Sequence, residues 1–327
     1  LRVHVLIDFL WLLLGLALLS LGGEWLVRGA REISLKMGIA PLVVGLTVVA
    51  FGTSAPELLV SLQANLKDPP KGDMALGNVV GSNICNIALI LGVGAVIRPI
   101  FVHLQILKRE MPILLIISAV FLWLLRDSAI DRGEGLMLFA GVITYTLISL
   151  RQARRTPRNV DRDALPDDKV ETVQSKSDGR MLYDVGFILL GMGALVYGAD
   201  RLVLGGSSIA RSFGVSEATI ALTVVAFGTS LPELATSIVA ALRRQGDMII
   251  GNAVGSCIFN ILCVVGLTAT VSPLTRTPDL QVWDLGVMLA LTFLLFPFLW
   301  RRRTLARGEG AILLAVYGVY ICYLALR

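Results

Sequence analysis

The chain has 327 residues, of which 55% are hydrophobic and 16% are charged, and its mean hydropathy is +0.77. Because water-soluble domains carry roughly 25% charged residues, this composition excludes a soluble protein and indicates a chain that lies in a lipid bilayer. The net charge of +5 does not indicate a nucleic-acid partner, since the basic residues are spread over many loops.

Ten apolar stretches follow one another along the chain. A helix needs about 20 residues to cross the hydrocarbon core, so we predict an all-α polytopic membrane protein with ten transmembrane helices. The fourth and fifth stretches are short for a span. The stretches are 9–27, 40–66, 74–97, 111–125, 135–150, 182–204, 216–242, 248–271, 282–300 and 311–326.

The stretch at 9–27 raises the question of a signal peptide. It is too long for the apolar region of one, shows no A-x-A cleavage pattern and runs on into Glu24 and Arg28. We therefore expect it to be the first transmembrane helix.

The basic residues predict the orientation. Of the 29 Lys and Arg residues, 20 fall in loops on one side of the predicted spans, and eight of these lie in 151–180. Loops rich in Lys and Arg stay in the cytoplasm. We expect a multi-pass protein of the cell (inner) membrane, with 151–180 in the cytoplasm and both ends of the chain outside it.

The chain has few histidine and cysteine residues that could act as ligands of a soft metal ion. The two histidines, His4 and His103, lie outside the predicted spans, so zinc or copper lacks ligands, and we expect no cofactor. The four cysteines lie within spans, show no pairing pattern and are interpreted as small core residues: Cys85, Cys257, Cys263 and Cys322.

The chain repeats itself. "LTVVAFGTS" occurs at 46–54 and 222–230, "GNVVGSNICNI" (77–87) aligns with "GNAVGSCIFNI" (251–261), and "RGEG" occurs at 132–135 and 307–310. The duplication therefore covers whole five-helix halves. Because five is odd, the halves have opposite orientations in the membrane, and inverted repeats of this kind place a shared site near the midplane.

These boundaries define three parts. Residues 1–150 form the first five-helix repeat and 181–327 the second. The linker 151–180 has eight basic and six acidic residues and no apolar period, so we interpret it as a solvated cytoplasmic connector.

The motif "GTSAPEL" (52–58) predicts a broken helix. Gly52 and Pro56 both disfavour a continuous helix, and Ser54 with Glu57 has the spacing of a capping box. We expect unwinding at Gly52–Thr53, a restart at Ser54 and free carbonyls near 50–53. Unpaired carbonyls at membrane depth are tolerated only where they line a cavity or coordinate something.

Glu57 and its counterpart Glu233 are the charged residues of these motifs. A carboxylate inside the membrane costs about 2.5–3.5 kcal/mol. A capping role alone is the alternative, but a serine caps nearly as well without that cost. Two carboxylates at equivalent positions therefore favour cation ligands.

Polar residues spaced by four continue on the following helices, so each set lies along one helix face. We expect Ser82, Asn86, Ser256 and Asn260 to be ligands. Asn78 and Asn252, nearer the helix ends, fit either ligands or bonds between helices.

The assembled site contains only oxygen donors, which Ca²⁺ and Na⁺ prefer. Two carboxylates neutralise one Ca²⁺ or at least two Na⁺ ions. Without a cation, two like charges would remain in a low dielectric and oppose reorientation, which predicts obligatory exchange rather than a leak. The donors are Glu57, Glu233, Thr53, Thr229, Ser54, Ser230, Asn86, Asn260 and freed backbone carbonyls.

The paired "GTSxPE" and "GNxxGSxxxN" motifs resemble those of the calcium/cation antiporter superfamily, the sodium/calcium exchangers, especially its short prokaryotic members. The resemblance covers nearly the whole chain. It implies ten helices in two inverted five-helix repeats, with ions held by helices 2, 3, 7 and 8 while helices 1 and 6 slide to alternate access.

The resemblance also implies roles for individual residues. Glu57 and Glu233 would be central ligands shared among several cation sites, Ser82 and Ser256 outer sodium ligands, and Asn86 and Asn260 mid-site residues. Further ligands would be Thr53, Thr229, Ser54, Ser230 and the carbonyls of Ala50 and Ala226. Some family members have aspartate at the position of Asn86 or of Asn260, whereas this chain has asparagine at both. That difference leaves sodium stoichiometry and the role of protons open.

The function predicted is a secondary antiporter that exchanges Ca²⁺ for Na⁺, with the lipid bilayer as its surroundings and no obligatory protein partner. Three alternatives remain: a proton-coupled exchanger that uses the same glutamates, a cation channel, and a membrane protease that uses Ser54. The protease lacks a nearby His or Lys within the spans to activate the serine.

Overall fold

A computed structural model describes residues 2–66, 70–155, 181–212, 226–276 and 282–326. These residues form an all-α membrane fold, as predicted, and eight of their helices are long and apolar enough to cross a membrane. The elements of the first half are α1 (Arg2–Met37), α2 (Pro41–Val44), η1 (Gly45–Val49), α3 (Ala50–Thr53), α4 (Ala55–Asn65), α5 (Gly72–Ile84), η2 (Cys85–Ile90), α6 (Leu91–Ile97), β1 (Ile100–Phe101), η3 (Ile106–Glu110), α7 (Met111–Leu124), η4 (Leu125–Asp127), β2 (Ala129–Ile130) and α8 (Arg132–Arg155).

The second half repeats this order. Its elements are α9 (Met181–Ser212), α11 (Ala226–Thr229), α12 (Leu231–Leu242), α13 (Gly246–Phe259), η8 (Asn260–Val265), α14 (Gly266–Val271), β3 (Leu274–Thr275), α15 (Val282–Arg302), β4 (Thr304–Leu305) and α16 (Arg307–Leu326). Each predicted span coincides with one helix or one run of consecutive helices. The linker from 156 to 180 and the part of the seventh span before Ala226 lie outside the described residues.

The short strands show how the halves are related. β1 pairs antiparallel with β4, and β2 pairs antiparallel with β3. In the repeat, β1 corresponds to β3 and β2 to β4. Exchanging the two halves therefore converts one strand pair into the other, as a two-fold axis between inverted repeats requires.

The repeated "RGEG" sequence caps a helix in each half. At the start of α8, Glu134 accepts the Asp131 N–H at 3.0 Å, while Asp131 accepts the Glu134 N–H at 2.8 Å. At the start of α16, Glu309 accepts the Ala306 N–H at 2.8 Å. These are capping-box contacts, which satisfy donors that a helix start leaves unpaired.

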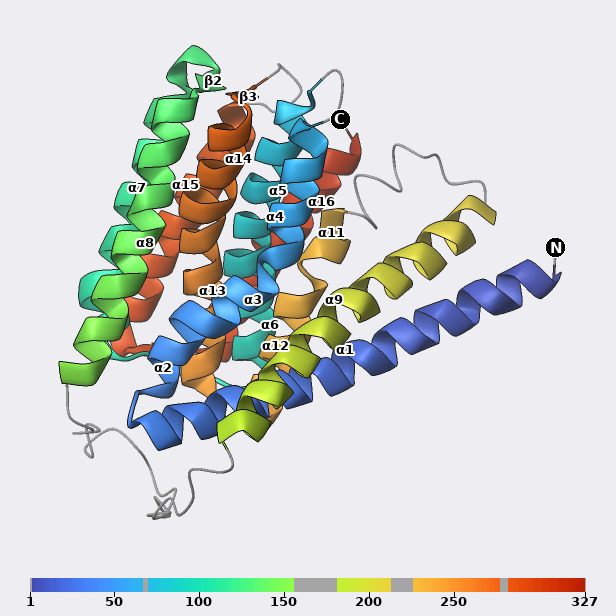
Figure 1. Cartoon of the computed structure of the whole chain (residues 1–327), viewed down its shortest axis with the longest axis horizontal. Helices are drawn as coiled ribbons and strands as arrows, with labels where there is room; N and C mark the ends of the chain where they lie inside the picture. Colours follow the sequence, from blue (N-terminus) through green and yellow to red (C-terminus); the bar gives the residue numbers. More distant parts are fainter. Residues whose placement is uncertain (1, 67–69, 156–180, 213–225, 277–281, 327) are drawn as a thin grey trace.

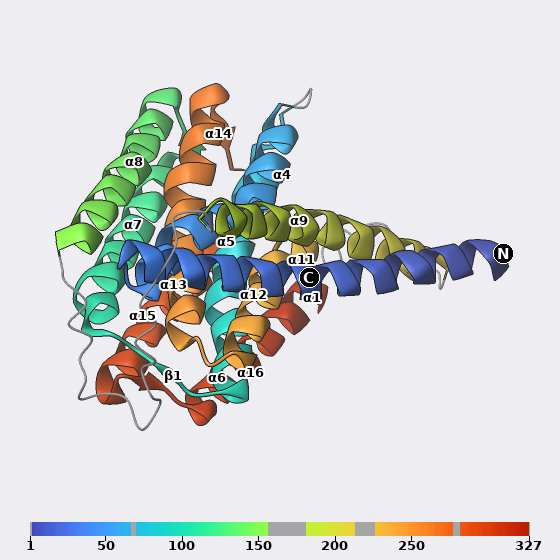
Figure 2. The ribbon, with the colours of Figure 1, turned by 60° about the horizontal axis from the view of Figure 1, so that its bottom comes forward.

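α1 and α9 form a separate pair of long helices that runs obliquely past the other helices (Figures 1 and 2). α1 has 36 residues, about 54 Å at 1.5 Å per residue, so it is longer than the hydrocarbon core is thick. Small residues allow the pair to approach closely: a Cβ on Gly22 would lie 2.8 Å from the Gly191 carbonyl oxygen, and one on Gly191 would lie 2.7 Å from the Leu26 nitrogen.

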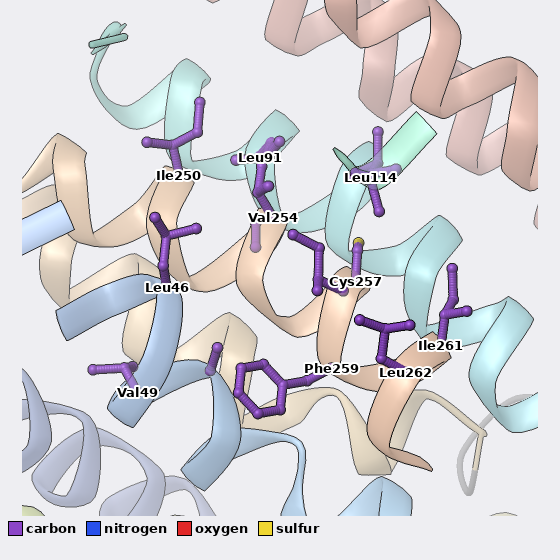
Figure 3. Close-up of a cluster of buried hydrophobic side chains, with 14 of the residues drawn as sticks. Leu46, Val49, Leu91, Leu114, Ile250, Val254, Cys257, Phe259, Ile261 and Leu262 are labelled. Carbon is purple, nitrogen blue, oxygen red and sulfur yellow. The ribbon is translucent and has the colours of Figure 1, made fainter. Parts of the chain in front are cut away.

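The core is organised around α13. Every residue of α13 from Met248 to Phe259 is buried, and Figure 3 shows its side chains among those of Leu46, Leu91 and Leu114. A Cβ on Gly255 would lie 2.8 Å from the Leu46 carbonyl oxygen, so glycine allows α13 to lie against η1. The helix that carries Asn252, Ser256 and Asn260 is thereby enclosed by protein.

Candidate cation site

The helix of the first motif breaks at Ser54, between α3 and α4. Its φ of −83° and ψ of 2° lie outside the helical region, and Ser230, in the second motif, has nearly the same values of −90° and 5°. Pro56 and Pro232 enter the new helices at their first turns, where a proline is tolerated. The predicted break is confirmed, but Gly52 and Thr53 are still helical.

The predicted capping box is wrong. Ser54 stands at the cap position, yet its side chain makes no capping hydrogen bond. Its hydroxyl donates instead to Oε1 of Glu233, in the other repeat, at 3.5 Å. The serine therefore links the two halves of the site rather than satisfying its own helix.

The prediction of free carbonyls needs a correction as well. The Ala50 carbonyl accepts the Ser54 N–H at 3.0 Å, as in a regular helix. It is the Gly52 carbonyl that loses its helical donor, since Pro56 has no N–H. In the second copy the Ser230 N–H donates to the Phe227 carbonyl at 3.2 Å rather than to that of Ala226.

Glu57 and Glu233 are both fully buried. Oε1 of Glu57 accepts the Ser82 hydroxyl at 3.5 Å, as Oε1 of Glu233 accepts that of Ser54. The Oε2 atom of each glutamate has no hydrogen-bond partner among the described residues, and the two carboxylates repel one another. A buried carboxylate oxygen without a partner is costly unless a cation neutralises it.

Asn78 and Asn252 link the two repeats symmetrically. The Thr53 hydroxyl donates to Oδ1 of Asn252 at 3.2 Å, and the Thr229 hydroxyl donates to Oδ1 of Asn78 at 3.3 Å. Asn78 also donates to the Glu57 carbonyl at 3.1 Å. The sequence left these two asparagines as either ligands or bonds between helices, and the hydrogen bonds described here join helices.

A second link joins the two motifs through serines. The Ser230 hydroxyl donates to Oγ of Ser82 at 3.3 Å, so Ser82 contacts residues of both broken helices. The repeat counterpart of Ser82 is Ser256, which is fully buried, and its hydroxyl has no partner among the described residues. The structure thus brings Glu57, Ser82 and Ser230 together.

Asn86 and Asn260 lie in π-helical turns, η2 and η8, at matching places in the two repeats. π-Turns within α-helices are frequent at functional sites. Both side chains are buried, and the Oδ1 atom of each lacks a partner within the described part of the chain. Neither Asn86 nor Ser256 is joined to the glutamates by a direct hydrogen bond.

Asn83 is a residue that the sequence did not assign to the site. Asn260 donates its amide to Oδ1 of Asn83 at 3.1 Å, and Asn83 donates to the Cys257 carbonyl at 3.4 Å. Asn83 therefore fixes the Asn260 amide, leaving its Oδ1 free. One feature of the sequence could have identified Asn83: its counterpart in the second repeat is Cys257, so a polar amide stands where the other repeat has a thiol.

The described residues contain no group of three or more His, Cys, Asp or Glu side chains able to hold a metal ion. Cys85, Cys257 and Cys263 are buried core residues, as predicted, whereas Cys322 is exposed, so its interpretation as a core residue is wrong.

Known proteins are similar to this chain in sequence. A family model described as sodium/calcium exchanger protein matches residues 7–151 and 183–326. The inner membrane protein YrbG of Escherichia coli K12 is 37% identical over 96% of this chain and 95% of its own length. The sodium/calcium exchanger MaX1 of Methanosarcina acetivorans is 31% identical over 98% of this chain and 99% of its own length.

A solved structure extends the likeness to three dimensions. The sodium-calcium exchanger NCX_Mj, soaked with 10 mM Na⁺ and 10 mM Sr²⁺, superimposes with a TM-score of 0.83 at 29% identity, over 97% of this chain and 98% of its own. The family model matches in two segments, and the structure contains two related strand pairs and two copies of the broken helix. All three features describe one duplicated architecture. This chain belongs to the sodium/calcium exchanger family of multi-pass membrane cation antiporters.

Proposed function

We propose that this antiporter exchanges Ca²⁺ for Na⁺ by alternating access, with Glu57 and Glu233 as central ligands. The observation that carries the proposal is a set of buried oxygens that have no partner among the described residues and come from four spans. They are Oε2 of Glu57 and Glu233, Oδ1 of Asn86 and Asn260, and Oγ of Ser256. Hard cations bind such oxygens, and two carboxylates balance one Ca²⁺.

The other proposed ligands surround these atoms. We infer that Thr53, Ser54, Ser82 and Ser230 turn their hydroxyls to the cations, since each already contacts the opposite repeat. Thr229 and the carbonyls of Ala50 and Ala226 complete the proposed ligand set. A carbonyl has two lone pairs, so the Ala50 oxygen can bind a cation while it keeps its helical bond.

The relatives support the choice of ions. MaX1 is named a sodium/calcium exchanger, and NCX_Mj was solved with Na⁺ and Sr²⁺, a divalent cation of the same group as Ca²⁺. Because this is a family of transporters, the alternative of a membrane protease that uses Ser54 is excluded.

The α1–α9 pair is the proposed moving part. Its two helices pack against each other through glycines and cross the helices that carry the site (Figure 2), where a Cβ on Gly52 would lie 2.6 Å from Met192 of α9. Sliding of the pair would open the site to one side at a time. Without a cation, the repulsion between Glu57 and Glu233 opposes that movement, which makes exchange obligatory.

The orientation also remains a proposal. The positive-inside rule places the linker 151–180 in the cytoplasm and both ends of the sequence outside, with the repeats at 1–150 and 181–327. YrbG is described as an inner membrane protein, which supports a place in the cell membrane.

Vesicles test the coupling ion. Vesicles that contain the protein are loaded with Na⁺, diluted into Na⁺-free buffer with radioactive Ca²⁺, and compared with vesicles under an imposed pH gradient. We expect uptake driven by the outward Na⁺ gradient. Uptake driven only by the pH gradient would reject sodium coupling in favour of proton coupling, and flux at channel rates would reject exchange.

A further inference from the structure

A cavity of about 370 Å³ lies between η3, α7, α8 and η8, apart from the cation site. One wall carries Arg109, Ile113 and Ile117, which are spaced by four and share a helix face. The opposite wall includes Gly141, Thr144 and Ile148 of α8. Apart from Arg109, the cavity is lined mainly by apolar side chains.

The cavity opens toward the lipid. Ile148 on its rim is 42% exposed, and its neighbours Ile143 and Leu147 are 49% and 48% exposed. Gly141 contributes to the space: a Cβ there would lie 3.3 Å from a methyl group of Leu262. An exposed apolar surface on a membrane helix contacts acyl chains, so an acyl chain is the ligand that can reach this groove.

At the charged end of the cavity, Arg109 has N–H groups that are not used in hydrogen bonds to the described residues. The Arg109 guanidinium donates one hydrogen bond to the Ser149 hydroxyl at 3.0 Å, and its Nη1 has no hydrogen-bond partner among the described residues. Nη1 lies 3.6 Å from Oε1 of Glu110, but Glu110 already accepts the Tyr145 hydroxyl at 2.9 Å and the Gln105 amide at 3.2 Å. With five N–H groups, Arg109 can still bind a phosphate.

The depth of the cavity fits one leaflet. Eight residues separate Arg109 from Ile117, a rise of about 12 Å along a helix. Half of the hydrocarbon core is about 15 Å thick. A phosphate at Arg109 therefore places an acyl chain between the interface and the midplane. Lys108 and Arg151 are exposed at the same end and add positive charge.

We propose that this groove binds an anionic phospholipid, with its phosphate on Arg109 and one acyl chain between α7 and α8. In the proposed orientation the lipid comes from the cytoplasmic leaflet. Leu262, at the inner end of the groove, lies two residues after Asn260 in η8. The lipid thus packs against the helix that carries part of the cation site.

Native mass spectrometry of the purified full chain tests this without using transport. The protein is offered phosphatidylglycerol and phosphatidylcholine with identical acyl chains. We expect about fivefold greater retention of phosphatidylglycerol, the factor that one basic residue at an anionic surface supplies. Arg109→Gln should abolish the preference and Arg109→Lys should keep it, whereas Arg301→Gln, elsewhere on the same membrane side, should leave it unchanged.

A second variant keeps all charges. Thr144 is exposed on the groove wall, and Thr144→Phe should fill the groove and reduce retention of both lipids. Ile143→Phe, one residue away and outside the groove, is the matched control. Equal retention of the two lipids by the parent protein, an anionic preference that survives in Arg109→Gln, or unchanged retention by Thr144→Phe would each overturn the proposal.

Discussion

The Ser54 hydroxyl donates to Oε1 of Glu233 at 3.5 Å, across 179 residues of sequence and between the two inverted repeats. A residue at the helix break of one repeat therefore contacts the carboxylate of the other. The site belongs to neither half alone, so a change in either motif should affect the binding of ions as a whole.

Loss of either central carboxylate should strongly weaken Ca²⁺ binding. Two unit charges about 4 Å apart interact by about 4 kcal/mol at an effective dielectric constant of 20. Because Ca²⁺ carries two charges, removing one carboxylate in Glu57→Gln or Glu233→Gln should weaken Ca²⁺ binding by at least about a thousandfold. Glu32→Gln on the accessible side of α1 is the control. Uptake of radioactive Ca²⁺ that persists in both site variants would reject the site.

Asn260→Asp tests whether the amide at this position is a cation ligand. The change adds a third carboxylate to the proposed ligand set, so affinity for Ca²⁺ should rise by at least about tenfold, or 1.4 kcal/mol. Asn86→Asp should act in the same direction from the other repeat. Titration of Ca²⁺-dependent thermal stabilisation measures the affinities. An affinity that is unchanged or lower in both variants would contradict a direct role for these amides.

Asn83 should act through Asn260. Asn83→Leu removes the acceptor that holds the Asn260 amide, and one such hydrogen bond is worth about 1 kcal/mol, or about fivefold in affinity. Asn83→Leu loses only the orientation of the Asn260 amide. In a variant that already carries Asn260→Ala, it should therefore not weaken Ca²⁺ binding further. Additive losses in the double variant would show that the two residues act independently.

The glycine contact between α1 and α9 should be sensitive to a single methyl group. A Cβ at Gly191 would meet backbone of α1, whereas one at Gly193, two residues away, meets no atom within 4 Å. Gly191→Ala should therefore destabilise the protein by about 1–3 kcal/mol, and Gly193→Ala should leave its melting temperature unchanged in detergent. Equal melting temperatures would argue against tight packing of the pair.

Much of the architecture could be predicted because bilayer length and repetition constrain it strongly. The apolar stretches locate the spans, and Gly52 with Pro56 locates the broken helix within two residues. The length of α1 could not be predicted, since the helix continues past the apolar stretch from Arg28 to Met37, where Arg28 lies over the Phe187 ring of α9. Polar residues there remain helical because tertiary contacts support them.

The site could be predicted only as far as residue type and spacing allow. Burial of Glu57 and Glu233 follows from charge in an apolar stretch. The partner of Ser54 does not, because local spacing favours a capping box and the hydroxyl is used instead by the opposite repeat. Asn83 is likewise invisible to periodicity: its role depends on Asn260, 177 residues away, which only the packing of α5 against η8 brings near.

Competition between the two ions at equilibrium tests the central claim most directly. Purified protein is saturated with radioactive Ca²⁺, and Na⁺ is added while bound Ca²⁺ is measured. Because both ions need Glu57 and Glu233, we predict that Na⁺ displaces all bound Ca²⁺, with a Hill coefficient above one, and that Glu57→Gln binds no Ca²⁺ to displace. Ca²⁺ that stays bound at saturating Na⁺, or a Glu57→Gln variant that binds and releases Ca²⁺ like the parent protein, would contradict a shared site.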